Sequence, residues 1–237
     1  ISLFETSSVE DTSAMFTYTG LMANKLKIKN LESWDVSNVK DMSGMFNQTG
    51  LNAIDWSIGD LSSWNPCNVT DMSFMFCVAG YKTPNWYIGD ISDWNVSNVN
   101  TMDRMFYYAG CGSEKFNIGN VGKWNVSKVT NMNCMFRGGC PHDTSEGAYN
   151  INNNKEWYIG DLSNWDVSNV TDMICMFRKT KNFNCNLSKW DVSNVTSIGW
   201  MFMDAGNEAT EMYIGDLSNW QTGKITSMYS AFNRLGY

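Results

Sequence analysis

The chain has 237 residues, of which 17% are charged, and its formal net charge is −7. An acidic chain without a basic run argues against nucleic acids and anionic membrane surfaces as partners. No stretch approaches 18 consecutive apolar residues, so the sequence predicts no membrane span.

The most informative pattern is an internal repeat that runs the length of the chain. Tryptophans recur at intervals of 30, 30, 30, 41, 25 and 30 residues, at Trp34, Trp64, Trp94, Trp124, Trp165, Trp190 and Trp220. A Met-Phe pair recurs in phase with them, as at Met75-Phe76. Self-similarity at such a period is typical of a solenoid. We therefore predict a single repeat solenoid domain over residues 1–237, with a long insertion at 137–156.

Each repeat begins with a segment that resembles a short strand. In one copy Trp165 and Val167 are apolar, whereas the intervening Asp166 is polar. This alternation predicts a half-buried strand, with its apolar side chains in the core.

The second half of each repeat changes its period. Met72, Met75, Phe76 and Ala79 fall at i, i+3, i+4 and i+7, which is one stripe of a helix of about two turns. Gly80 follows, and a glycine just past a helix commonly adopts the left-handed cap conformation. The pattern predicts one strand and one short helix in each coil.

These elements together predict an α/β architecture. Repeated strands of this kind run parallel, and their crossovers are right-handed. We expect a right-handed stack of eight strand-plus-short-helix coils. Because helices are wider than strands, the parallel sheet is expected on the concave face.

One motif carries a family resemblance. Trp-Asp-Val-Ser-Asn-Val-Thr-Asp-Met-x-x-Met-Phe, which begins at Trp165, resembles the repeat of BspA-like leucine-rich-repeat surface proteins. The resemblance covers nearly the whole chain and implies a leucine-rich-repeat-like solenoid. It also implies adhesion or binding in an extracellular or cell-surface setting, with an organelle lumen as the alternative. Most copies are longer than the family repeat, and these insertions are where specificity is expected.

A polar row on the expected concave face is the first candidate binding site. An Asp or Asn follows each tryptophan, at Asp35, Asn65, Asn95, Asn125, Asp166 and Asp191. Such a row would bind a flat ligand, and Asp166 and Asp191 would share a cation. The alternative, which we favour, is a self-satisfied ladder that solubilises the sheet face.

A second Asx row precedes each tryptophan by four residues, as at Asp60 and Asp90. Asx residues favour turns through hydrogen bonds to their own backbone. Calcium is the alternative, since Gly-Asp repeats bind it in other repeat proteins, but the nonapeptide period of those sites is missing. We expect structural turns and no cofactor.

A second aromatic column lies eight residues before the strand tryptophans, at Trp56, Trp86 and Trp157, with Phe116 and Met212 in the matching positions. We expect these rings to seal the edge of the core. If they are partly exposed, they would suit sugar stacking or a protein interface.

The cysteines and the glycosylation sequons give further hypotheses. Cys111 and Cys140 follow equivalent helices and are the favoured disulfide, with burial as small hydrophobes as the alternative. Cys134 and Cys175 share one helical phase, but adjacent helices are expected to hold them too far apart for a bridge. Asn47 is the favoured N-glycosylation site, because it is expected to lie free just past a helix.

Catalysis has little support in the sequence. The single histidine, His142, lies in the insertion, and no nucleophile motif or metal-ligand spacing is present. We predict a non-enzymatic interaction module that binds protein or glycan. The alternative is a structural subunit or spacer, with neighbouring subunits covering the ends of the solenoid.

Overall fold

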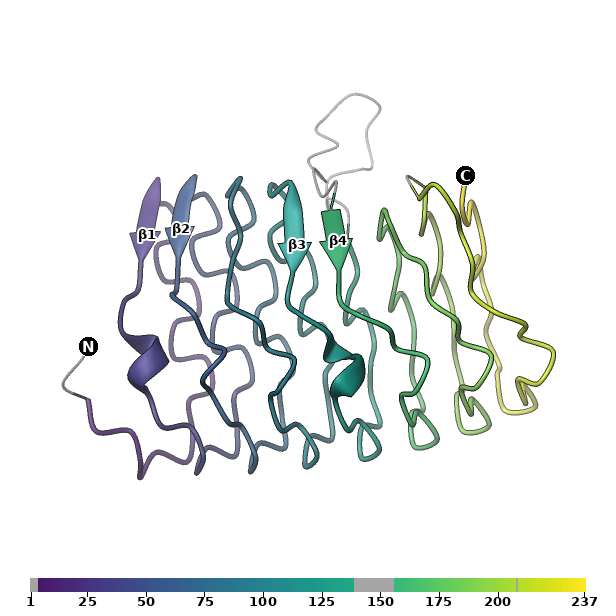
Figure 1. The fold of residues 1–237 in the computed structure, drawn as a ribbon, viewed down its shortest axis with the longest axis horizontal. Coiled ribbons are helices and arrows are strands. Elements are labelled where there is room, and N and C mark those ends of the chain that lie inside the picture. The colour runs from purple at the N-terminus through teal and green to yellow at the C-terminus, as the bar shows by residue number, and fades with distance from the viewer. Residues whose placement is uncertain (1–3, 139–155, 208) are drawn as a thin grey trace.

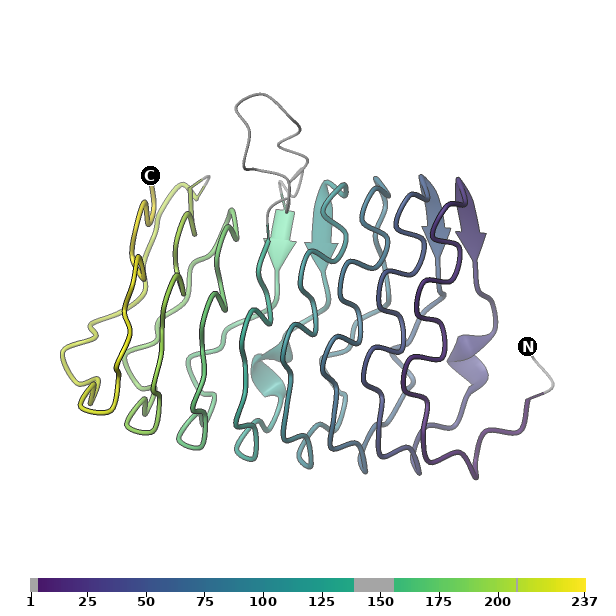
Figure 2. The ribbon, with the colours of Figure 1, turned by 180° about the vertical axis from the view of Figure 1, so that it is seen from behind.

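The computed structural model describes residues 4–138, 156–207 and 209–237. Successive coils of the chain lie side by side in sequence order from one end to the other (Figure 1). The same order is visible from behind (Figure 2). Equivalent residues pair as parallel bridges from coil to coil, at Asp11, Asp41, Asp71, Thr101, Asn131, Asp172, Ser197 and Ser227. The repeat in sequence is therefore also a repeat in space.

Regular secondary structure is sparse in the described part of the chain. The strands are β1 (Lys25–Lys27), β2 (Asp55–Ser57), β3 (Lys115–Asn117) and β4 (Glu156–Tyr158). β1 pairs in parallel with β2, and β3 pairs in parallel with β4. Two single turns of 3-10 helix, η1 (Leu31–Ser33) and η2 (Val121–Lys123), are the only helical elements among the described residues. None of these elements is a helix long and apolar enough to cross a membrane.

The predicted short helices are wrong, although their buried stripe is confirmed. Met72, Met75, Phe76 and Ala79 are all fully buried. Their backbone, however, forms consecutive turns instead of an α-helix. We call this segment, 72–80 and its equivalents in the other coils, the turn ribbon.

Hydrogen bonding explains why the turn ribbon replaces a helix. The amide of Phe76 donates to the Met105 carbonyl of the next coil at 2.9 Å, and that of Val78 donates to Tyr107 at 2.7 Å. The intervening amides bond three residues back within the coil, as Ala79 does to Phe76 at 3.1 Å. An α-helix would use every amide internally. The ribbon uses alternate amides to join coils.

The turn ribbon needs left-handed backbone at regular positions. Phe74 has φ 58°, Val78 has φ 57° and Gly80 has φ 55°. The glycine conformation is the predicted one, although it closes turns and not a helix. A left-handed conformation is unfavourable for residues with a Cβ, above all for a β-branched residue such as Val78. The hydrogen bonds between coils offset this strain.

The predicted strand around each tryptophan is also wrong, although the predicted burial of its side chains is confirmed. Trp165 and Val167 are buried and Asp166 is exposed, yet residues 164–168 form no strand. The parallel strands lie in the inserted segment before the tryptophan, where Leu26 pairs with Trp56 and Phe116 with Trp157. No sheet is formed by the residues that were expected to build the concave face.

Aromatic ladders fill the core. Phenylalanines of successive turn ribbons stack from Phe16 to Phe232, as Phe46 does on Phe76 with ring centroids 5.5 Å apart. The tryptophan column is buried beside them, and the Trp94 indole N–H donates to the Leu61 carbonyl of the preceding coil at 2.9 Å. The chain is thus a repeat protein with short parallel strand pairs, an extensive aromatic core and almost no helix.

Candidate binding surface

The predicted row that follows the tryptophans is exposed, and its side chains close local turns. Asp35 Oδ1 accepts the Ser37 amide at 2.9 Å, and Asp191 Oδ1 accepts the Ser193 amide at 2.9 Å. Hydrogen bonds from the side chains of Ser37 and Ser193, and then from their amides, lower the pKa of each carboxyl group. The same turn recurs at Asn95, Asn125 and Asp166. Asn65 is exposed as well. The role of this row in binding a ligand stays a prediction.

The second Asx row also builds turns. Asp60 Oδ1 accepts the Ser62 amide at 2.9 Å, and Asp90 Oδ1 accepts the Ser92 amide at 2.9 Å. Gly89 has φ 94°, and a Cβ there would overlap Asp60 Oδ1 of the preceding coil. The Gly-Asp pairs of the sequence therefore reflect close stacking of turns. Within the described ranges, no three His, Cys, Asp or Glu side chains gather in an arrangement that could hold a metal ion.

The second aromatic column is core, as predicted, at three of its positions. Trp56, Trp86 and Phe116 are buried, and Trp86 stacks between the other two at 6.0 and 5.0 Å. Trp157 and Met212 are half-buried and pack against the same core. The column is therefore a wall of the core.

Sequence reasoning missed the residues that follow this column. Tyr87, Tyr158 and Tyr213 are 56%, 50% and 55% exposed. Successive side chains of an extended segment point to opposite sides, so each buried ring directs the next residue outward. The signal was available in the sequence, because Tyr-Ile-Gly-Asp recurs at 87–90, 158–161 and 213–216.

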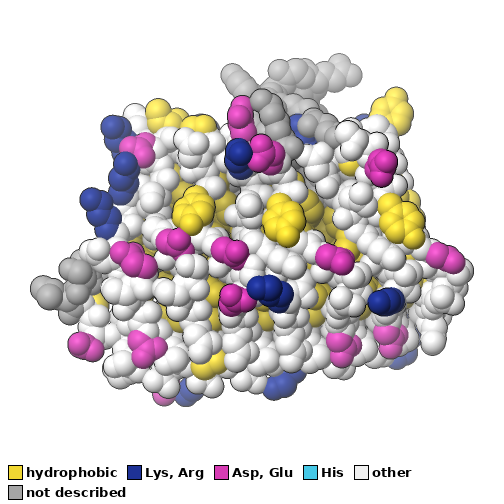
Figure 3. All heavy atoms as spheres, in the orientation of Figure 1, with side chains coloured by type: hydrophobic (Ala, Val, Ile, Leu, Met, Phe, Trp, Pro, Cys, Tyr) yellow, Lys and Arg dark blue, Asp and Glu magenta, His cyan; other side chains and the backbone are white. Residues whose placement is uncertain are grey.

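We call these three residues the tyrosine row. They occupy one position in alternate coils, and the coils between them carry the exposed Asn117 and Asn184 at that position. Figure 3 shows this face, where hydrophobic side chains stand singly above a line of acidic ones. The row therefore alternates flat aromatic surface with amide groups.

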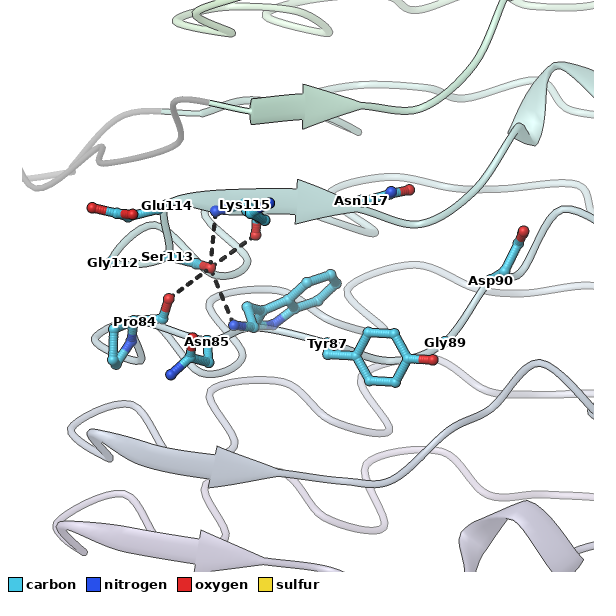
Figure 4. Close-up of a pocket in the computed structure, with 11 residues that line it drawn as sticks. Pro84, Asn85, Tyr87, Gly89, Asp90, Gly112, Ser113, Glu114, Lys115 and Asn117 are labelled. Atoms are coloured by element: carbon cyan, nitrogen blue, oxygen red, sulfur yellow. Dashed lines mark hydrogen bonds between the residues drawn. The ribbon is translucent and has the colours of Figure 1, made fainter.

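A surface cavity of about 620 Å³ adjoins Tyr87 (Figure 4). Its lining includes Pro84, Asp90, Lys115 and Asn117. Hydrogen bonds fix the backbone that lines the cavity. Ser113 Oγ accepts a bond from the Trp86 amide at 3.1 Å and donates one to the Lys115 carbonyl at 2.8 Å. An acidic and a basic side chain, Asp90 and Lys115, thus line the cavity beside Tyr87.

The Tyr87 ring is held by a second coil. Its hydroxyl donates to Asp60 Oδ2 at 2.8 Å, and this bond raises the pKa of Tyr87. The pKa of Asp60 is lowered, first by its hydrogen bond with Ser62. The ring is therefore preorganised while its face stays open to solvent.

Three remaining sequence hypotheses fare differently. Asn47 is half-buried within a turn ribbon, with its Oδ1 buried and unpaired among the described residues, and its glycosylation stays a prediction. Cys111 is buried, but Cys140 lies outside the described residues, so their disulfide stays a prediction. His142 and most of the insertion at 137–156 also lie outside the described residues, so the hypotheses about them stay predictions.

The fold and its repeated surface define a class of protein, namely a repeat protein with a stacked aromatic core and a periodic polar-aromatic face. A family model described as "Mycoplasma protein of unknown function, DUF285" matches three times, at residues 1–80, 51–158 and 147–236. The chain belongs to this family. No curated protein and no solved structure matches it.

Proposed function

We propose that the protein is a non-enzymatic adhesion module at the cell surface that binds an extended glycan along the tyrosine row. The observation that carries the proposal is the placement of Tyr87, Tyr158 and Tyr213 at one position of alternate coils, each about half exposed. The BspA-like motif supports the surface setting and a leucine-rich-repeat-related solenoid. Extracellular polymers are the natural ligands in that setting.

The spacing of the row suits a polysaccharide. Neighbouring coils in parallel register are about 5 Å apart. Successive tyrosines of the row lie in alternate coils and are therefore about 10 Å apart. This is close to the length of a disaccharide in an extended glycan chain. The C–H faces of pyranose rings pack on aromatic rings, and a tyrosine combines apolar area with a polar edge. Every second sugar would therefore meet a ring.

The groups beside the row suit hydroxyl recognition. Asn117 and Asn184 lie between the tyrosines, and an amide both donates and accepts hydrogen bonds. Asp90 lines the cavity beside Tyr87, and bonds from Ser92 lower its pKa. A carboxylate held ionised in this way accepts hydrogen bonds from sugar hydroxyls. It is a poor proton donor at neutral pH, which favours binding over acid catalysis.

The test compares the tyrosine row with tyrosines elsewhere on the surface. The triple variant Tyr87→Ala/Tyr158→Ala/Tyr213→Ala is titrated against a panel of extended polysaccharides by isothermal calorimetry. Loss of three exposed stacking contacts should weaken binding at least tenfold. The matched control is Tyr18→Ala/Tyr229→Ala, which removes two exposed tyrosines outside the row.

The outcomes separate the candidate ligands. Glycan binding that survives the triple variant would contradict the proposal. Binding to unglycosylated peptides that the triple variant abolishes would identify the row as a protein interface instead.

A second candidate function, a structural subunit within an assembly, is favoured by exposed apolar side chains. Met22, Tyr229 and Phe232 are 81%, 67% and 43% exposed. A neighbouring subunit would cover them. Light scattering should then show association of the chain that Met22→Glu/Phe232→Glu disrupts, and a monomeric parent chain at high concentration would exclude this candidate.

A further inference from the structure

The turn ribbon aligns two cysteines that a helix would have separated. Asn131 and Asp172 pair as a parallel bridge, and three residues later the Cys134 amide donates to the Ile174 carbonyl at 2.8 Å. Cys134 and Cys175 are therefore in register on neighbouring coils. Parallel neighbours lie about 4.8 Å apart, which is within the Cα separation of about 4.4–6.8 Å that a disulfide spans.

The two thiols contact each other in a buried setting. Both are reduced, and each is only 5% exposed. A hydrogen bond from the Cys134 thiol to the Cys175 sulfur lowers the pKa of Cys175 and raises that of Cys134. The positive charges of Arg137 and Arg178 lower the pKa of Cys175 further. One sulfur is thus prepared as a nucleophile and the other as its proton-bearing partner.

The arginines around the pair leave donors unused. Arg137 is held over the rings of Tyr107 and Tyr108, at 5.3 and 5.2 Å from their centroids. The Nε groups of Arg137 and Arg178 are buried and have no hydrogen-bond partner in the part of the chain that the structure describes. Buried cationic donors without acceptors fit an anion at the sulfur, either a thiolate or the sulfenate formed by its oxidation.

We propose that Cys134 and Cys175 form a peroxide-reactive dithiol site that closes to a disulfide between adjacent coils. The Cys175 thiolate attacks one oxygen of hydrogen peroxide, the O–O bond breaks, and hydroxide leaves and is protonated to water, so Cys175 becomes a sulfenic acid. The Cys134 sulfur then attacks the Cys175 sulfur, and the second oxygen leaves as water with the Cys134 proton. Overall, two thiols and one peroxide give one disulfide and two waters.

The bridge would cross-link the coils on either side of the long insertion. It closes the chain between residues 134 and 175 into a loop, which restricts the unfolded state and stabilises the folded one. Two other buried cysteines serve as internal controls, since burial raises the pKa of Cys77 and of Cys185 to about 12. Neither has the low pKa that favours reaction with peroxide.

The experiment treats the full chain with hydrogen peroxide, alkylates the remaining thiols, and maps peptides by mass spectrometry without reduction. The expected result is a peptide that links Cys134 to Cys175, with Cys77 and Cys185 still alkylated. The melting temperature should rise by about 5 °C on oxidation and return on reduction with dithiothreitol. Recovery of Cys134 and Cys175 as free thiols, or bridged to other cysteines, would overturn the proposal.

Two variants test the assigned roles. Cys134→Ser removes the resolving thiol, so peroxide should leave a sulfenic acid at Cys175 that dimedone traps. Arg137→Gln keeps both sulfurs but removes a positive charge, and should slow the oxidation about tenfold, whereas Cys77→Ser should not change its rate. Dimedone labelling of Cys134 in a Cys175→Ser variant at the same rate would show that the nucleophile is misassigned.

Discussion

The two sides of each coil hold the stack together by different means. In the turn ribbon, backbone amides at alternate positions, such as Phe76 and Val78, bond directly to the next coil. On the tryptophan side, side chains add bonds between coils to those of the backbone, such as that from the Leu61 amide to the Ile88 carbonyl at 2.7 Å. The Trp94 indole donates to Leu61 at 2.9 Å, and the Asn98 amide group donates to Cys67 at 2.8 Å.

This difference explains which positions vary among the repeats of this chain. Where side chains join the coils, their chemistry is fixed, so the tryptophan recurs without change at seven positions. Where the backbone joins the coils, side chains at some positions are free to differ. The ribbon position of Phe74 is occupied in other coils by Gly44, Arg104, Cys134, Cys175 and Trp200. The side with the more variable sequence is held by the more uniform hydrogen bonding.

The largest expected effect on stability follows from removing a tryptophan side chain from the core. Trp94→Ala should destabilise the protein by about 3–5 kcal/mol, because it leaves a large cavity between stacked rings. Chemical denaturation measures the change. A stability equal to that of the parent chain would show that tryptophan packing does not hold the tryptophan side of the coils together.

A smaller effect of opposite sign is expected from the turn ribbon. Val78→Gly should stabilise the protein by up to about 1 kcal/mol, because glycine relieves the left-handed strain at φ 57°. Val78 is half-buried and packs against the cluster of Tyr81 and Tyr108, so this gain is net of the contact that glycine loses. The control is Val69→Gly, since Val69 is fully buried at an ordinary φ and should lose stability instead. Equal losses at the two sites would show that the ribbon carries no strain.

The smallest effect on stability is expected from single aspartate carboxyl groups of the Asx turns, which occur on both sides of the coil. Hydrogen bonds from Ser13 and Ser37 lower the pKa of Asp11 and Asp35, and those from Ser92 lower the pKa of Asp90. A depressed folded pKa contributes stability above the unfolded pKa of about 3.9 and loses it as pH falls through the folded value.

The melting temperature should therefore be level from about pH 7 to pH 5 and fall below about pH 4. Asp35→Asn keeps an acceptor for the Ser37 amide and should flatten part of this acid dependence. An unchanged melting temperature down to pH 2 would show that these carboxylates are not coupled to folding.

The sequence by itself determined the periodicity, the parallel stacking of repeats and most of the core. Trp94, Met75 and Phe76 are buried as their pattern predicts. The left-handed glycines, such as Gly80, were also predictable, because glycine alone adopts that conformation without strain. The candidate site was only half visible, since Trp86 was recognised and its neighbour Tyr87 was passed over.

Only the tertiary structure decided between a helix and a turn ribbon. Met72, Met75, Phe76 and Ala79 face the core in either conformation, so apolar spacing does not separate the two. The choice depends on hydrogen-bond partners about 30 residues away, such as the Met105 carbonyl that accepts the Phe76 amide. The same distant register exposes Tyr87 and brings Cys134 against Cys175. Local pattern fixes which side chains are buried, whereas partners in the next coil fix the backbone that carries them.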